Sequence, residues 1–238
     1  MARWHAVNWT RYHSLLVELA NRGHEVYVLQ PPPLKSEETN FQEIPYVEQK
    51  NISLFEVKVL PMVWNTKFPL DKLIKKALFS LCAYKQAKQL VEREGIDLVL
   101  LYNIPQYFFS KLGSVIQIFD FADDYIDMLE EELGSFSLPP LIGLARKMLG
   151  TMMGRADITL SVSHELAKQA IGEVTVLPNG VSPEKSASSI DISVSVNNEG
   201  KSIVGFIGSF EYFIDFDIII SAAKALPQYH FLLVGTGR

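Results

Sequence analysis

The sequence predicts an α/β fold in which helices cover both faces of a parallel sheet. Three observations favour this class. Apolar strand-like runs alternate with amphipathic helical segments, the runs are apolar throughout, and a second strand–helix–strand pattern follows a Ser- and Asn-rich stretch. Strands separated by helices are typical of parallel sheets with right-handed crossovers. Runs that are apolar on both faces are typical of strands buried between helical layers.

The composition fits a globular protein and excludes several other classes. The 238 residues are 48% hydrophobic and 21% charged, enough for one large domain or one and a half. The net charge of −5 disfavours nucleic-acid binding. The single cysteine, Cys82, excludes an internal disulfide and a Cys-rich metal site, and we expect it to be buried.

No targeting or membrane-spanning pattern is visible in the sequence. No charge-free apolar run reaches the roughly 18 residues that a transmembrane helix needs. The start, MARWHAVNWT, lacks the basic end and apolar stretch of a secretory signal. We therefore expect a cytoplasmic protein.

The first half of the chain opens with a helix. Asn8 or Thr10 can cap a helix that includes residues 15–23, and Gly23 ends it. The elements that follow are a strand at 25–30 ended by three prolines, a strand at 52–60, an amphipathic helix at 71–94 closed by Gly95, and a buried-type strand at 96–102.

The same alternation continues in the next eighty or so residues. The expected elements are a short helix near 105–112, a strand at 114–120, a helix around 140–154, a strand at 158–163, a helix at 164–170 capped by Ser163, and a strand at 173–179.

The character of the sequence changes after Asn179. We expect a first domain over 1–180, a Ser- and Asn-rich linker over 181–201, and the beginning of a second domain over 202–238. The second domain shows a single βαβ pattern, which cannot cover its own sheet and therefore looks cut short. A doubly wound domain usually opens with a strand, so either RWHAV is a degraded first strand or residues are missing upstream.

The stretch VLPNGV marks the exit from the first domain. Asn179 and Gly180 are residues that tolerate the left-handed backbone of a sharp turn, so we expect a hinge there. The plain alternative is an ordinary Asn-Gly turn.

Several stretches resemble GT-B glycosyltransferases, and most closely the retaining family 4 enzymes that use nucleotide sugars. The more specific ones are PNGV with its polar linker and the later IVGFIGSF and VGTG. RYHSLLVELANRGHEVYVL, IFDFADDYIDM and ADITLSVSHELAKQA are also similar to that group. Together they cover most of the chain at intermittent density. The resemblance implies an acceptor domain followed by the start of a nucleotide-sugar domain.

The glycines that follow two strands of the second pattern are the expected donor-binding residues. The resemblance places Gly208 and Ser209 near the donor diphosphate, and Gly235 and Gly237 near the nucleotide. Small residues at the end of a strand let main-chain N–H groups approach a phosphate. Taken singly, each is equally an ordinary strand-to-helix turn. No GxGxxG fingerprint supports a dinucleotide cofactor.

One segment departs from the family pattern. SFEYFIDFD places acids where an Arg and a Lys commonly grip the diphosphate, which puts the donor contacts in doubt. The Glu-rich donor motif of the family would lie beyond Arg238, so we expect the chain as given to be inactive.

Three acids follow the strand at 114–120. Asp120 lies where ligands bind in open α/β sheets, and it is the expected catalytic residue, by accepting a proton from an acceptor hydroxyl or by holding that hydroxyl. Asp123 and Asp124 are candidate acceptor-binding residues, with capping of the next helix as the alternative. Family 4 enzymes work without a metal, so we expect none.

Arg11 and His13 lie early in the first helix and are further acceptor-binding candidates, although a lone histidine is more often structural. The helix at 71–94 carries lysines beside apolar residues, and residues 141–155 add Arg146, Lys147 and Arg155. Such stretches suit contact with an anionic membrane, although a charged face is usually only solvated.

The expected function is transfer of a sugar from a nucleotide-sugar donor to a hydroxyl acceptor, with no cofactor. Two alternatives remain. One is a GT-B-fold sugar-nucleotide epimerase, and the other is a non-catalytic binding or scaffold subunit, for which the acidic SFEYFIDFD segment is the best support.

Overall fold

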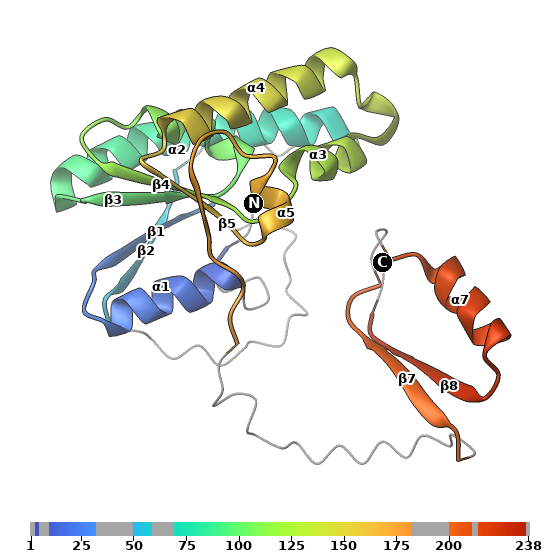
Figure 1. Ribbon diagram of the computed structural model, residues 1–238. Helices are drawn as coiled ribbons and strands as arrows, with labels where there is room; N and C mark the ends of the chain where they lie inside the picture. The colour runs from blue at the N-terminus through green and yellow to red at the C-terminus, as the bar shows by residue number, and fades with distance from the viewer. Residues whose placement is uncertain are drawn as a thin grey trace. The chain divides into compact units, whose positions relative to one another are not determined.

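The computed structural model describes residues 3–4, 10–31, 50–58, 69–181, 200–210 and 214–236. The chain forms two compact units, residues 1–181 and residues 182–238, and each is described by itself (Figure 1). Both contain parallel strands joined through helices, which confirms the α/β class and is consistent with Rossmann-like domains.

Unit 1 begins with a helix and a two-stranded parallel sheet. Helix α1 (Arg11–Asn21) has Thr10 as its N-cap, and the chain leaves it through Gly23 at φ 93°, as expected. Strand β1 (Val26–Gln30) pairs in parallel with β2 (Ile52–Glu56).

The second sheet of unit 1 has four parallel strands in the order β3-β4-β5-β6. Their bounds are Leu98–Leu101, Ile116–Phe121, Ile158–Ser161 and Val174–Val176. Helix α2 (Pro69–Glu94) precedes β3. The connections are η1 (Ile104–Lys111), α3 (Tyr125–Leu133), η2 (Gly134–Phe136), α4 (Pro139–Arg155) and α5 (His164–Ala167).

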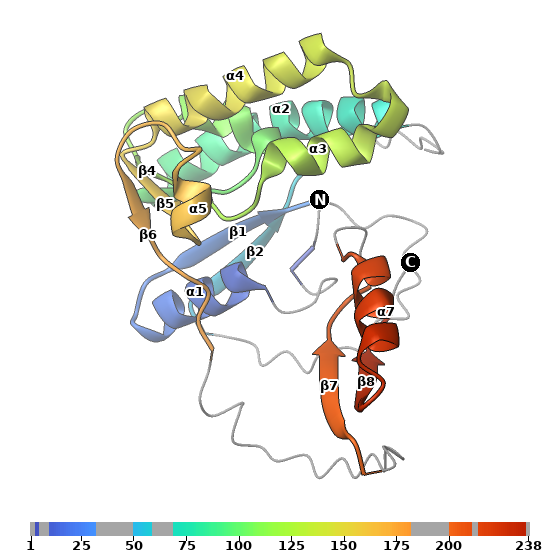
Figure 2. The same ribbon diagram turned by 45° about the vertical axis from the view of Figure 1, so that its right-hand side comes forward.

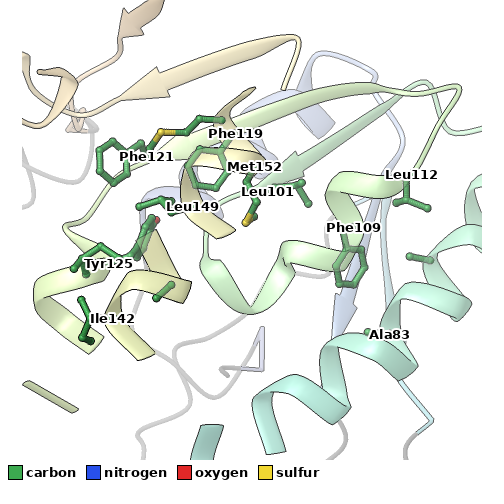
Figure 3. Packing of buried hydrophobic residues seen from close by; sticks show 14 of the residues in the cluster. Ala83, Leu101, Phe109, Leu112, Phe119, Phe121, Tyr125, Ile142, Leu149 and Met152 are labelled. Atoms are coloured by element: carbon green, nitrogen blue, oxygen red, sulfur yellow. The ribbon is translucent and has the colours of Figure 1, made fainter. Parts of the chain in front are cut away.

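The core of unit 1 lies between the four-stranded sheet and one helical layer. Figures 1 and 2 place α2, α3 and α4 on one side of β3 to β5 and α1 on the other. Phe119 and Phe121 of β4 point from the sheet into this core and pack with Tyr125 of α3 and Met152 of α4 (Figure 3). Cys82 is only partly buried and packs against the same cluster.

The parallel strands of unit 1 form two sheets rather than one. Among the described residues, no strand joins β1 to β3. Helix α2 nevertheless contacts residues of both sheets. Its Gln86 side chain accepts from the main-chain N–H of Lys58, just after β2, and donates to the carbonyl of Lys58. Its Ala83 and Ala87 lie in the core cluster that includes residues of β3 and β4. The two sheets are therefore linked through helix packing.

Unit 2 is one βαβ unit. Strand β7 (Ser202–Ile207) pairs in parallel with β8 (Tyr229–Val234), and α7 (Phe216–Ala225) connects them with Asp215 as its N-cap. No described residue of this unit is buried, and Ile207 is 85% exposed. Its apolar side chains therefore have little core of their own.

Candidate functional site

Arg11, Asp120 and Asn179 meet at the carboxyl end of the four-stranded sheet. Arg11 Nε donates to Asp120 Oδ2 at 2.8 Å, and Arg11 Nη2 donates to Asp120 Oδ1 at 3.3 Å. Arg11 Nη1 donates to Asn179 Oδ1 at 3.2 Å. The structure thus brings together three predicted site residues that are far apart in the sequence.

The fold explains why this ion pair is buried. Asp120 lies near the end of β4, which is flanked by β3 and β5, and its side chain has no exposed surface. Arg11 is the first residue of α1, and its side chain is only 9% exposed. A paired Asp and Arg balance each other's charge, and loss of either would leave the other uncompensated. In this geometry Asp120 holds Arg11 rather than facing solvent as a base.

A cluster of tyrosines surrounds the pair. The rings of Tyr12 and Tyr102 stack with centroids 4.1 Å apart, and the Tyr125 hydroxyl donates to the main-chain oxygen of Asp120 at 3.3 Å. The Tyr12 and Tyr125 hydroxyls interact electrostatically, yet the Tyr12 hydroxyl is buried without a hydrogen bond of good geometry. Burial raises the pKa of Tyr12, Tyr102 and Tyr125. The three hydroxyls are therefore neutral at physiological pH.

Asp123 and Asp124 have different surroundings. Asp124 caps α3, because its Oδ1 accepts from the N–H groups of Ile126 and Asp127 at 3.2 and 3.1 Å. Asp123 is exposed, and no described residue hydrogen-bonds its carboxylate. Partial desolvation, and then the negative charge of Asp120, raise the pKa of the Asp123 carboxyl. The alternative expectation was that both acids cap the next helix. It is confirmed for Asp124, which caps α3, and not for Asp123.

An open depression lies beside this edge, between α3, α4 and the chain after α5. Its volume is about 490 Å³, and Asp124 lines it together with Asp127 and Arg146. Its apolar lining includes Phe121 and Leu149. The depression therefore presents both polar and apolar surface.

His13 has an internal structural role. Its Nδ1 accepts from the Thr10 main-chain N–H at 3.0 Å, and its Nε2 bonds the carbonyl of Trp4 at 2.9 Å. The ring is buried and packs against Trp4 with centroids 4.3 Å apart. Both ring nitrogens of His13 thus form hydrogen bonds within the protein, and the side chain links α1 to Trp4.

The expectation of a left-handed backbone conformation at Asn179 and Gly180 is wrong. Neither residue has a positive φ, and the chain leaves β6 without a turn. Both residues are exposed, and Asn179 contributes through its side chain, which accepts from Arg11. The Asn-Gly pair permits the left-handed conformation, but nothing in the observed path requires it.

Gly208 and Gly235 directly follow the carboxyl ends of β7 and β8. A Cβ at Gly235 would lie 1.8 Å from the carbonyl oxygen of Gly208, so the two strand exits pack backbone against backbone. The N–H groups of Gly208 and Phe210 bond the carbonyls of Val234 and Thr236 at 3.0 and 2.8 Å. Ser209 is exposed, and Gly237 lies outside the described residues.

The comparisons leave the family open. Neither the models of known protein families nor the curated proteins gave a match to this chain. Within the described ranges, no three His, Cys, Asp or Glu side chains converge as metal ligands would. The helices that the structure describes are all too short or too polar to cross a membrane.

The sequence identified Arg11, Asp120 and Asn179 as site residues but did not indicate that Arg11 binds the other two, and it did not single out the tyrosines. A signal for the tyrosines was present. Tyr102 directly follows β3 and Tyr125 begins the helix after β4, and the carboxyl ends of adjacent parallel strands meet at one edge.

Proposed function

We propose that this protein is a GT-B glycosyltransferase that moves a sugar from a nucleotide sugar to a hydroxyl acceptor with retention of configuration. Unit 1 binds the acceptor, and unit 2 contributes to the nucleotide-sugar site. The observation that carries the proposal is the position of Asp123, exposed beside the buried Arg11–Asp120 pair at the carboxyl edge of a parallel sheet. Ligands of open α/β sheets bind at this edge. The resemblance of PNGV, IVGFIGSF and VGTG to family 4 enzymes supports the same function.

The residues of unit 1 have distinct roles in this proposal. Asp123 accepts a hydrogen bond from the acceptor hydroxyl, because the residue is exposed and no described residue hydrogen-bonds its carboxylate, while that of Asp120 is occupied by Arg11. Asp120 is a positioning residue that fixes Arg11 and, through it, Asn179. The depression lined by Asp124 accommodates part of the acceptor. The acceptor oxygen bonds to the anomeric carbon while the bond from that carbon to the nucleoside diphosphate breaks, and Asp123 takes the hydroxyl proton. Orientation of the two substrates provides most of the acceleration.

One observation favours a non-catalytic GT-B-fold subunit as the second candidate. The N–H groups of Gly208 and Phe210, two main-chain donors at the expected diphosphate position, are already bonded to the exit of β8. A diphosphate at this position would have to rely on other donors, such as the main chain of the exposed Ser209.

The test is an assay of nucleotide-sugar hydrolysis and transfer by the full-length protein, with UDP-, GDP- and ADP-sugars and with and without EDTA. The proposal predicts nucleotide release that EDTA leaves unchanged. Asp123→Asn is expected to lower kcat at least tenfold, because general acid–base groups contribute roughly 10² to 10⁴ in rate.

Asp97→Asn is the matched control, since Asp97 is also exposed but precedes β3 at the opposite, amino end of the sheet. Equal losses in the two variants would contradict the role of Asp123. Nucleotide binding without turnover would indicate the non-catalytic subunit, and the absence of both would reject a nucleotide-sugar site altogether.

A further inference from the structure

Helix α2 has an outward stripe that its packing in unit 1 does not use. The residues that face the core are Ser80, Ala83, Ala87 and Leu90, which are all buried. Leu81, on the opposite side of the helix, is 43% exposed. The outward stripe follows helical spacing and consists of Ile74, Ala77, Leu78, Leu81, Lys85 and Lys88.

The stripe is apolar in its first half and basic in its second. Ile74, Leu78 and Leu81 are 46%, 40% and 43% exposed. Lys85 and Lys88 continue the same stripe toward the carboxyl end of α2 and are exposed. At about 1.5 Å per residue, the stripe is roughly 21 Å long.

The charge of this helix is opposite to that of the whole chain. The chain has 27 acidic and 22 basic residues, yet residues 74–88 contain four lysines and no acid. Lys76 forms an ion pair with Glu132 of α3, which fixes α2 against its neighbour and turns the stripe away from it. Within the described part of the chain, no acid pairs with Lys85 or Lys88.

We propose that the outward stripe of α2 docks on an anionic lipid bilayer surface. The aliphatic side chains enter the headgroup region, and the lysines lie against the negative surface. A second copy of the chain is a poorer partner, because a stripe of three large aliphatic residues falls short of the roughly 800 Å² per partner of a stable interface. This proposal does not depend on the glycosyltransferase proposal, because it needs neither donor nor acceptor.

The test is co-sedimentation of the whole chain with vesicles of phosphatidylcholine alone and of phosphatidylcholine mixed with phosphatidylglycerol. We expect binding to the anionic vesicles that weakens as salt is raised. Lys85→Gln and Lys88→Gln should each reduce the partition coefficient about fivefold, the effect of one lysine near an anionic surface. Leu78→Gln should reduce it by at least a similar factor, because an aliphatic side chain no longer enters the bilayer.

Two matched controls are available. Leu19 of α1 is 40% exposed, like Leu78, and Lys224 of α7 is exposed, like Lys85, so Leu19→Gln and Lys224→Gln should bind as the unchanged protein does. All these positions are on the surface, and circular dichroism checks that each variant is folded. No binding to anionic vesicles, or equal losses in the controls, would overturn the proposal. A dimer in sedimentation velocity that Leu78→Gln dissociates would instead identify a second copy as the partner.

Discussion

Asp123 is the residue whose titration should report most directly on the candidate site. Desolvation and the charge of Asp120 raise the pKa of its carboxyl, so we expect an NMR titration to place it above the usual range for aspartate. Asp120→Asn should lower the pKa of Asp123, because the neighbouring negative charge is removed. A midpoint at or below the ordinary value in the unchanged protein would show that the carboxylate is better solvated or paired than the structure indicates.

The same shift predicts how Asp123 affects stability. A carboxyl whose pKa is higher in the folded state binds protons more readily there than in the unfolded chain, so its contribution to stability is present at low pH. That contribution is lost as pH rises through the folded pKa. At neutral pH, Asp123→Asn should therefore leave the free energy of unfolding unchanged or slightly raised, and urea unfolding at several pH values measures it. A clear loss of stability at neutral pH would mean that the ionised form makes a favourable contact.

The Arg11–Asp120 pair should behave as one unit. Arg11→Met leaves a buried carboxylate without its partner, and we expect it to lower the free energy of unfolding by about 3–5 kcal/mol. The double variant Arg11→Met with Asp120→Leu should cost clearly less than Arg11→Met alone, because no buried charge remains. Urea unfolding followed by circular dichroism measures both. Simple additivity of the two single changes would show that the pair is not coupled.

At the scale of elements, the close contact between the exits of β7 and β8 makes a sharp prediction. Gly235→Ala places a Cβ against the carbonyl oxygen of Gly208, so the strand ends must separate, at a cost of about 1–3 kcal/mol. Hydrogen exchange at Gly208 N–H and Phe210 N–H should accelerate, because their acceptors lie on the displaced strand. Gly205→Ala is the matched control within β7, since a Cβ there has no heavy atom within 4 Å. Unchanged exchange in Gly235→Ala would contradict the contact.

The elements also show what the sequence could and could not reveal. Helix ends with local signals were predictable: Thr10 caps α1, Ser163 caps α5, and Gly95 follows α2 with φ 65°. The α/β class followed from alternation alone. The path at Asn179 was not predictable, because a residue type limits which backbone conformations are allowed, and the surrounding contacts select one of them.

The orientation of α2 was beyond the sequence for a similar reason. Its apolar residues run around more than one side of the helix, so periodicity did not identify which side packs inward. The structure buries the small residues Ser80, Ala83 and Ala87, which allows α2 to approach η1 closely and leaves Leu78 and Leu81 outside. At the candidate site, the pairing of Arg11 with Asp120 depends on a tertiary contact that no local pattern encodes.

At the scale of the whole molecule, the two units should differ in local stability. Unit 1 has a continuous core that includes Phe119, Phe121 and Met152, whereas no described residue of unit 2 is buried. Few buried apolar contacts correspond to low free energies of local opening. Native-state hydrogen exchange should therefore show faster exchange for the amides of β7 and β8 than for those of β4 and β5. Equal protection in both sheets would indicate that the apolar side chains of unit 2 are covered in solution.

The buried ion pair of unit 1 also has a consequence for evolution. Replacing Arg11 alone or Asp120 alone leaves an unpaired charge inside the protein. Selection should therefore act against single substitutions at either position. An apolar pair carries no such penalty, and substitutions at the two positions should therefore be correlated among descendants of the same ancestral gene. Chains that retain one charge should retain both, and a lineage that has lost one should have lost the other.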